Sequence, residues 1–329
     1  MLPFALEPVC KDYLWGGTRL RDQWGLGRGL ERVAEAWTLA AHPDGDCPVA
    51  GQEESMTLAS AVRAHPDMVS PTQRPEDPFP VLVKLIDAAL PLSIQVHPDD
   101  ACAARLEGSG PGKTEMWYVL NNKPGAFLYL GFEHEVSRDE VERRALDGTL
   151  PEVLKKIEVR RGDAFFIPAG TVHAIGGGIL LAEVQQNCNL TYRLFDYGRI
   201  GPDGRPRELH LEKALTAARL TPVTAAPGST EERPLPRGSL RVLADCPAFR
   251  AEVLRLDGSM EIPSRGGFFS LLCLEGEAEL RREGGEPLAA SRGTSLFIPA
   301  TAGICRLQGR AEFLIAFHRA FPEQKIPLP

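Results

Sequence analysis

RRGDAFFIPAGTVHAI, residues 160–175, is the stretch that decides the fold. A Gly-Asp pair opens a short apolar run, a proline closes it, and a second glycine precedes His173. Apolar runs of about 4–8 residues between such turn residues are typical of strands in a compact antiparallel sheet. A second stretch, SRGTSLFIPATAGICR at 291–306, repeats the Arg-Gly pair, the apolar run and Phe-Ile-Pro-Ala. The two segments indicate that one β unit occurs twice in the chain.

Strand-like runs also dominate the sequence around these two segments. They include FPVLVKLI (79–86), PLSIQVH (91–97), MWYVL (116–120), ILLAEVQ (179–185) and FFSLLCL (268–274). Helical spacing of apolar residues appears only at 57–69, 137–157 and 207–220. Many short strands separated by Gly, Pro and Asp turns favour barrels or jelly rolls. We expect a mainly β protein made of two jelly-roll β-barrels with helical insertions.

A Pro- and Gly-rich stretch divides the two β units. Residues 221–238 read TPVTAAPGSTEERPLPRG, a composition typical of a linker. We therefore predict a catalytic domain at 1–220, a linker at 221–238 and a smaller domain at 239–329. Alignment of the two units places Phe269 and Ile304 of the second where the first has Glu115 and His173. The second unit thus repeats the strand pattern of the first but lacks its polar, ligand-type residues. We therefore expect the functional site in the first unit.

Composition narrows the class of protein further. Of the 329 residues, 43% are hydrophobic and 25% charged, which suits a soluble protein with a sizeable core. No apolar run reaches the roughly 20 residues of a spanning helix, and the N-terminus lacks a secretion signal. The net charge of −7 argues against nucleic acid as a partner. We expect a cytoplasmic monomer or homodimer that acts on a small molecule away from membranes.

Polar side chains recur at every second position of two predicted strands. Ser93, Gln95 and His97 share one face of PLSIQVH, and Lys113 and Glu115 share one face of GKTEMWYVL. Successive side chains on a strand point to opposite faces, so each strand has one polar face. Consecutive strands with polar faces inside a β-sandwich would line a pocket.

A third polar face runs through EVQQNCNLTYR, residues 183–193. Its odd positions are all polar and begin with Glu183 and end with Arg193, whereas its even positions are mostly apolar. Read as one strand, the segment places Glu183 and Arg193 on the same face as the predicted pocket.

Two histidines and a glutamate on these faces suit a divalent metal. Catalytic zinc sites commonly use three N or O ligands and leave a position open for water or substrate. His97, Glu115 and His173 provide that set, and Gln95 could add an amide oxygen or act behind the ligands. The same set also fits the facial triad of non-haem iron, so residue types alone do not name the metal.

Several of these segments resemble known families. G-D-x-x-x-x-P-x-G-x-x-H at 162–173 is similar to the second signature of the cupin superfamily. Six segments, in order over the first 200 residues, resemble the short bacterial form of phosphomannose isomerase type I. They are LWGG (14–17), AEAWTLAAHPDG (34–45), PLSIQVHPDD (91–100), GKTEMWYVL (112–120), GDAFFIPAGTVHAIGGG (162–178) and QQNCNLTYRLFDYGR (185–199).

The resemblance implies specific roles for residues of this chain. It implies one zinc ion per chain at His97, Glu115 and His173, with Gln95 beside it. It implies a catalytic arginine at Arg193. By analogy with the longer eukaryotic enzymes of this family, Trp15, Ser93 and Lys113 would line the sugar-phosphate pocket.

The activity implied is conversion between mannose 6-phosphate and fructose 6-phosphate. The reaction holds an open-chain sugar while a proton moves between C1 and C2 through an enediol(ate). Lys113 is the candidate for attracting the phosphate. Glu183 could be the general base, or it could form a structural ion pair, and the sequence leaves both open.

Three alternatives share parts of this pattern. An iron-dependent cupin oxygenase would use the same two histidines and glutamate but leaves Arg193 unexplained. A related metal-dependent enzyme acting on another sugar phosphate, or a cupin that only binds sugar, are the other two. The complete ligand set favours catalysis over binding alone.

Overall fold

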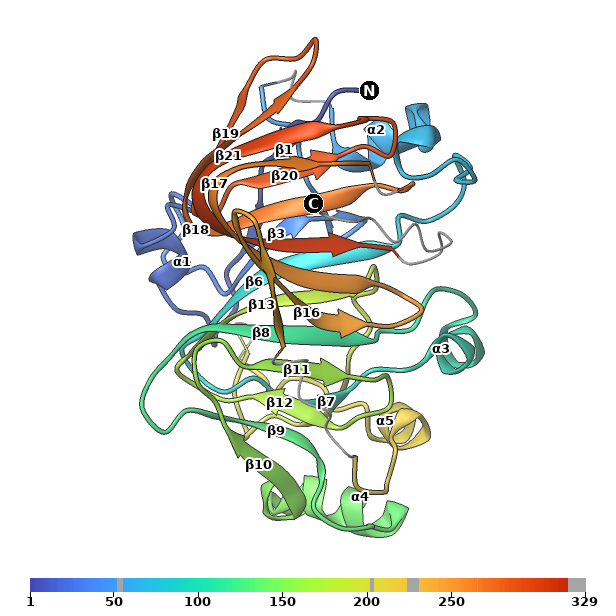
Figure 1. Ribbon diagram of the computed structural model, residues 1–329. Helices are drawn as coiled ribbons and strands as arrows, with labels where there is room; N and C mark the ends of the chain where they lie inside the picture. The colour runs from blue at the N-terminus through green and yellow to red at the C-terminus, as the bar shows by residue number, and fades with distance from the viewer. Residues whose placement is uncertain (52–55, 202–203, 224–230, 265, 319–329) are drawn as a thin grey trace.

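The computed structural model describes residues 1–51, 56–201, 204–223, 231–264 and 266–318 (Figure 1). Its strands form antiparallel sheets of eight, six and five strands, together with the two-stranded ribbon of β4 (Ala41–His42) and β5 (Gly45–Asp46). The prediction of a mainly β protein is confirmed. Within these ranges, no helix has the length and apolar character needed to cross a membrane.

The six-stranded sheet lies in the middle of the molecule. Its order is β11 (Ala164–Ile167), β8 (Glu115–Asn122), β13 (Ile179–Gln186), β6 (Val81–Ala88), β3 (Glu35–Leu39) and β2 (Val9–Lys11). Every residue of β6 is buried, as are seven of the eight in β13. A strand covered on both faces reads as a nearly continuous apolar run, which is how FPVLVKLI and ILLAEV read.

The five-stranded sheet packs on one face of this central sheet. Its order is β10 (Leu154–Glu158), β9 (Phe127–Phe132), β12 (His173–Ile175), β7 (Ile94–Val96) and β14 (Tyr192–Phe195). Leu181 and Trp117 of the central sheet meet Leu128 and Ile175 of this one in a shared apolar core. The outer face of the five-stranded sheet carries the helices α4 (Arg138–Asp147) and α5 (Leu211–Ala217), with α3 (Asp100–Glu107) beside α5.

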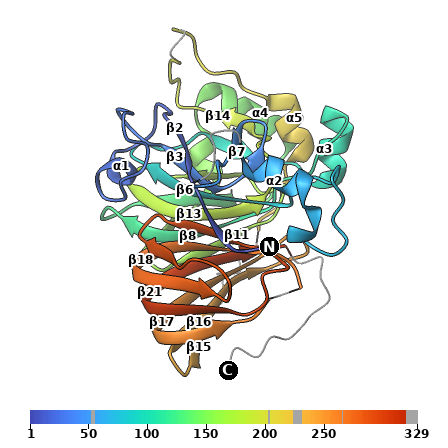
Figure 2. The same ribbon diagram turned by 90° about the horizontal axis from the view of Figure 1, so that it is seen from above.

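The eight-stranded sheet covers the other face of the central sheet. Its order is β1 (Phe4–Leu6), β20 (Ser295–Ile298), β18 (Phe269–Arg282), β21 (Cys305–Phe317), β17 (Arg250–Ile262), β16 (Gly238–Asp245) and β15 (Glu232–Leu235), and β19 (Leu288–Ser291) also pairs with β18. Val83 and Val184 of the central sheet pack into one core with Phe268 and Leu314. Figure 2 shows the resulting order of layers, with the eight-stranded sheet on one side and the helices on the other.

The helices are shorter than the periodicity predicts. The segment 57–69 forms α2 (Leu58–Ala64), which Thr57 caps, and the short η1 (Pro66–Met68). The segment 137–157 is helical only in α4, because Gly148 ends it in a left-handed conformation (φ +83°). The turn η2 (Leu150–Val153) and strand β10 follow. The segment 207–220 yields α5 alone, and α1 (Arg19–Asp22) is a single additional turn.

The sequence repeat is reproduced in the strand register. In the first unit Ile167 of β11 pairs with Glu115 of β8, and in the second Ile298 of β20 pairs with Phe269 of β18. Glu115 and Phe269, which align in sequence, therefore occupy equivalent positions in the two units. Phe269 is buried where Glu115 stands in the first unit, and Ile304 is 62% exposed.

Two strands lie across the expected domain boundaries. β15 falls inside the stretch predicted as a linker, 221–238, of which residues 224–230 are outside the described part of the chain. β1 pairs with β20, so the N-terminal segment contributes a strand to the sheet formed by the C-terminal unit.

Candidate metal centre

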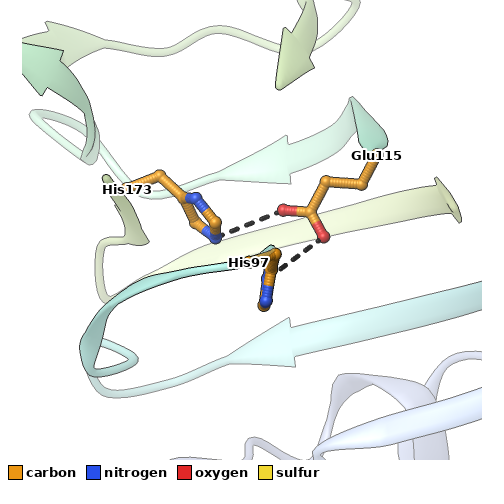
Figure 3. A group of neighbouring side chains, drawn as sticks. All are labelled: His97, Glu115 and His173. Atoms are coloured by element: carbon orange, nitrogen blue, oxygen red, sulfur yellow. Dashed lines mark ion pairs between the residues drawn. The ribbon is translucent and has the colours of Figure 1, made fainter. Parts of the chain in front are cut away.

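Three ligand-type side chains meet between the five- and six-stranded sheets (Figure 3). His97 follows β7 directly, Glu115 opens β8 and His173 opens β12. One ligand atom of each lies within 4.8 Å of those of the other two. His97 Nε2 is 3.5 Å from Glu115 Oε2, and His173 Nε2 is 3.3 Å from Glu115 Oε1. The structure thus brings together the three residues that the sequence singled out as metal ligands.

Both imidazoles are oriented by backbone carbonyls. Nδ1 of His97 lies 2.8 Å from the carbonyl of Leu190, and Nδ1 of His173 lies 2.9 Å from that of Thr171. A carbonyl only accepts, so Nδ1 carries the proton and Nε2 presents a free lone pair. Burial holds the pKa of His97 well below its ordinary value and lowers the pKa of His173 to about 4. Both rings are therefore neutral, as metal binding requires.

Two buried polar atoms that face the centre have no hydrogen-bond partner in the described part of the chain. Glu115 is completely buried, and neither its Oε1 nor His173 Nε2 has a hydrogen-bond partner among the described residues. Burial raises the pKa of Glu115 to about 7, against the effect of the neighbouring Lys113. A buried carboxylate and imidazole without partners cost free energy unless a cation joins them. This donor set fits a divalent metal.

Lys113 reaches the same atoms from one side. Its Nζ is 2.7 Å from Glu115 Oε2 and donates to His97 Nε2 at 3.1 Å. The side chain is 5% exposed. Burial lowers the pKa of Lys113, but the carboxylates of Glu115 and Glu183 outweigh burial and raise it. The ammonium is thus charged and lies inside the centre.

Arg193, Gln95 and His173 form a row across the five-stranded sheet. Arg193 pairs with Gln95, and Gln95 pairs with His173, so the three side chains share one face. Ser93 Oγ donates to Gln95 Oε1 at 3.1 Å. Arg193 donates from Nη1 to the carbonyl of Glu208 at 2.8 Å, whereas its buried Nε has no partner in the described ranges. An unsatisfied donor on this face can bind an oxygen of a ligand.

Glu183 and Arg193 do not lie on one strand, as the alternation of residues 183–193 had predicted. β13 ends at Gln186, a turn follows in which Cys188 N donates to the Gln186 carbonyl at 2.7 Å, and Arg193 belongs to β14 in the facing sheet. The chain crosses from one sheet to the other here, because β13 is already paired on both sides with β6 and β8. The two polar faces still look into the same interior.

Glu183 sits in a chain of buried charges. Its Oε2 accepts from Trp117 Nε1 at 2.8 Å, and its Oε1 is 3.6 Å from Lys84 Nζ and 3.8 Å from Lys113 Nζ. Burial raises the pKa of Glu183, but the two lysines and the indole outweigh burial and lower it. Glu183 is therefore held ionised between two buried lysines.

Lys84 was missed by the sequence reasoning. It is 3% exposed and bridges Glu183 and Glu35, whose Oε2 is 3.5 Å away and also accepts from Trp37 Nε1 at 2.7 Å. A signal was available, because Lys84 interrupts the apolar run VLVKLI and a buried lysine almost always has an acidic partner.

Trp15 is 4% exposed and packs in the apolar core shared by the two sheets, with Trp117 and Leu92. Its place in a sugar pocket stays a prediction.

Comparison with known proteins identifies the family. The model of the phosphomannose isomerase type I catalytic domain matches residues 3–127, and that of the mannose-6-phosphate isomerase cupin domain matches residues 241–318. Over 320 residues the chain is 33% identical to a mannose-6-phosphate isomerase of Bacillus subtilis, covering 95% of this chain and 98% of the relative.

Solved structures agree with this match. The crystal structure of a mannose 6-phosphate isomerase from Bacillus subtilis is similar with a TM-score of 0.88 and 30% identity, covering 96% of this chain and 99% of that one. A zinc-bound mannose 6-phosphate isomerase has the same fold, with a TM-score of 0.75 and 17% identity over 97% of this chain and 100% of that one. The chain belongs to the phosphomannose isomerase type I family.

Proposed function

We propose that the protein interconverts mannose 6-phosphate and fructose 6-phosphate at a zinc ion held by His97, Glu115 and His173. The observation that carries the proposal is the convergence of two neutral imidazoles and one carboxylate on a buried point, in a chain of this family. Gln95 is the proposed fourth ligand, because it is paired with His173 and directed by Ser93. A single ion per chain would satisfy the partnerless Glu115 Oε1 and His173 Nε2.

The residues around this centre provide the parts of an aldose–ketose isomerisation. Zinc, when bound, would stabilise negative charge on the C1 and C2 oxygens of the open-chain sugar. Arg193 is permanently cationic and its free Nε can bind an oxygen that gains charge in the enediolate. Glu183 is the candidate to move the proton between C2 and C1, since its carboxylate is held ionised.

Binding of the sugar phosphate is assigned to three other residues. Ser93 lies on the polar face of its strand, Lys113 offers a buried ammonium that can attract the phosphate, and Trp15 borders the apolar end of the same interior.

Restoration of activity by metal tests the function. Metal-stripped protein should not convert mannose 6-phosphate, and one equivalent of zinc should restore formation of fructose 6-phosphate under anaerobic conditions. Anaerobic turnover also separates the isomerase from an iron-dependent oxygenase, which needs oxygen. Zinc binding without any turnover of mannose 6-phosphate would contradict the proposal.

We further infer the organisation around the site. The division into residues 1–220, a linker at 221–238 and residues 239–329 is supported by the sequence repeat and by its matching register. We infer that each unit is a jelly-roll barrel, with the five-stranded sheet and the central sheet as the halves of the first. We also infer a cytoplasmic monomer or homodimer, and the net charge of −7 supports the absence of a nucleic-acid partner.

A further inference from the structure

Lys113 uses the atoms that a metal would use. Its ammonium lies 2.7 Å from Glu115 Oε2 and 3.1 Å from His97 Nε2. Because Nδ1 of His97 carries that ring's proton, the Nε2 lone pair is the only one the ring can offer to either cation. The lysine and a divalent ion therefore cannot both be bound by His97 Nε2, and both would compete for the charge of Glu115.

The backbone beside Lys113 is fixed, so only its side chain can give way. Lys113 N donates to the carbonyl of Pro98 at 2.9 Å, and Thr114 N donates to Gln186 Oε1 at 2.9 Å. A Cβ on Gly112 would lie 2.5 Å from the backbone carbon of Asp99, which shows how closely the two segments approach. This contact holds the backbone of Lys113 next to the segment that carries His97.

Glu183 offers the ammonium a second place. Its Oε1 is 3.8 Å from Lys113 Nζ, is buried, and has no partner at hydrogen-bond distance in the described part of the chain. Movement of the Lys113 side chain toward this atom would satisfy Glu183 and release Glu115 and His97. Lys113 thus lies between two carboxylates. A metal at this centre would bind Glu115 but not Glu183.

We propose that Lys113 is an internal counter-cation that neutralises Glu115 when no metal is bound and is displaced toward Glu183 when zinc enters. The inference rests on the proposed zinc centre. It adds that Lys113 competes with the metal for Glu115 and His97. A buried carboxylate without a counter-charge is costly, so the lysine stabilises the metal-free fold. Zinc must displace a positive charge, and the lysine therefore weakens zinc binding.

Lys113→Met tests this, because methionine keeps the length and removes the charge. We expect the variant to bind zinc at least about tenfold more tightly than the wild type in competition with a chelator, because no ammonium opposes the ion. We also expect the urea midpoint of the metal-free variant to fall, and that of the zinc-loaded variant to change less.

Lys84→Met is the matched control. Lys84 is an equally buried lysine that contacts Glu183 and Glu35. Glu183 lies between it and the proposed metal ligands. Its removal should change zinc affinity severalfold less than that of Lys113. Equal gains in both variants would show a general charge effect and overturn the inference.

A second variant keeps the test decisive if Lys113→Met does not fold without metal. Lys113→Met/Glu115→Gln removes both charges, and its metal-free form should be more stable than that of the single variant. The single variant, purified with zinc, still yields the affinity by chelator competition. Unchanged or weaker zinc binding by Lys113→Met would overturn the counter-cation, whereas a wild type that binds no zinc would overturn the proposed function itself.

Discussion

The imidazoles of His97 and His173 each donate a hydrogen bond from Nδ1 to a backbone carbonyl. Only Nε2 is left for the centre, so the loss of either ring removes one ligand that nothing nearby replaces. We expect His173→Ala to lose zinc and turnover together, measured as zinc per chain by atomic absorption and as fructose 6-phosphate formed. A variant that keeps one zinc ion and full activity would remove His173 from the centre.

Arg193 should behave differently, because it lies beside the ligands without being one. We expect Arg193→Ala to retain one zinc ion per chain while kcat falls on the order of 100-fold or more, as for other groups that stabilise developing negative charge. Arg161→Ala, at a 63% exposed arginine, is the control and should keep its activity. Loss of zinc in Arg193→Ala would show that the residue supports the centre instead of the reaction.

The pKa of His173 makes the metal-free protein sensitive to acid. Burial lowers this pKa to about 4 in the folded protein, whereas the unfolded chain has a value near 6.5. As pH falls from about 6.5 toward 4, protons bind the unfolded state first, and the free energy of unfolding decreases. For this group the loss between pH 7.5 and pH 5 is about 2 kcal/mol.

The variant His173→Gln isolates that contribution. Urea unfolding of metal-free wild type and variant at both pH values should show a smaller decrease for the variant, by about 2 kcal/mol. Identical pH dependence of the two proteins would mean that His173 is not buried as a neutral ring.

At the scale of the elements, alternation of polar residues found the right faces but misjudged where a strand ends. Ser93, Gln95 and His97 lie on one face because their alternation is a local property of a single strand. The alternation from Glu183 to Arg193 was equally regular, yet the chain turns after Gln186 and enters another sheet. That turn is set by pairing with β6 and β8, which are distant in sequence.

Gly112, which precedes β8, lies very close to the backbone of Asp99 at the start of α3. An added methyl group would lie 2.5 Å from backbone, so the segment carrying Lys113 and Glu115 would have to move away from His97. We expect Gly112→Ala to weaken zinc binding at least about tenfold and to lower the free energy of unfolding by about 1–3 kcal/mol. Chelator competition and urea unfolding measure the two effects.

Ser109→Ala provides the control for this prediction, since Ser109 is exposed in the same connection between α3 and β8. It should leave both quantities unchanged. Normal zinc affinity in Gly112→Ala would mean that the segment can shift without disturbing the ligands.

For the whole molecule, the repeat was visible in the sequence because Arg-Gly and Phe-Ile-Pro-Ala are local patterns, and their register is the same in both units. The convergence of His97, Glu115 and His173 could also be predicted, since each lies on or directly beside a recognisable strand. The pairing of β1 with β20 and the bridge of Lys84 between Glu35 and Glu183 could not. Both depend on how distant segments pack.

The two units are joined by an aromatic cluster. Phe268 is 1% exposed, stacks on Phe297 at a ring distance of 5.3 Å, and lies 4.9 Å from Phe79 just before β6. We expect Phe268→Ala to lower the free energy of unfolding by about 3–5 kcal/mol, measured with urea, because it leaves a cavity between the sheets.

The zinc content and kcat of folded Phe268→Ala should match the wild type, since the cluster lies on the face of the central sheet opposite the centre. Phe268→Leu fills part of the cavity and should lose less stability. A Phe268→Ala protein as stable as the wild type would show that the units do not depend on this contact.

The place of β1 has a consequence for how the protein is made. Phe4, Ala5 and Leu6 are translated long before their partners Phe297, Leu296 and Ser295. The strands that hold the ligands pair only within residues 9–195 and can assemble during synthesis. β1 must therefore wait for β20 to be translated, and it can dock only after the strands around the ligands have had time to pair.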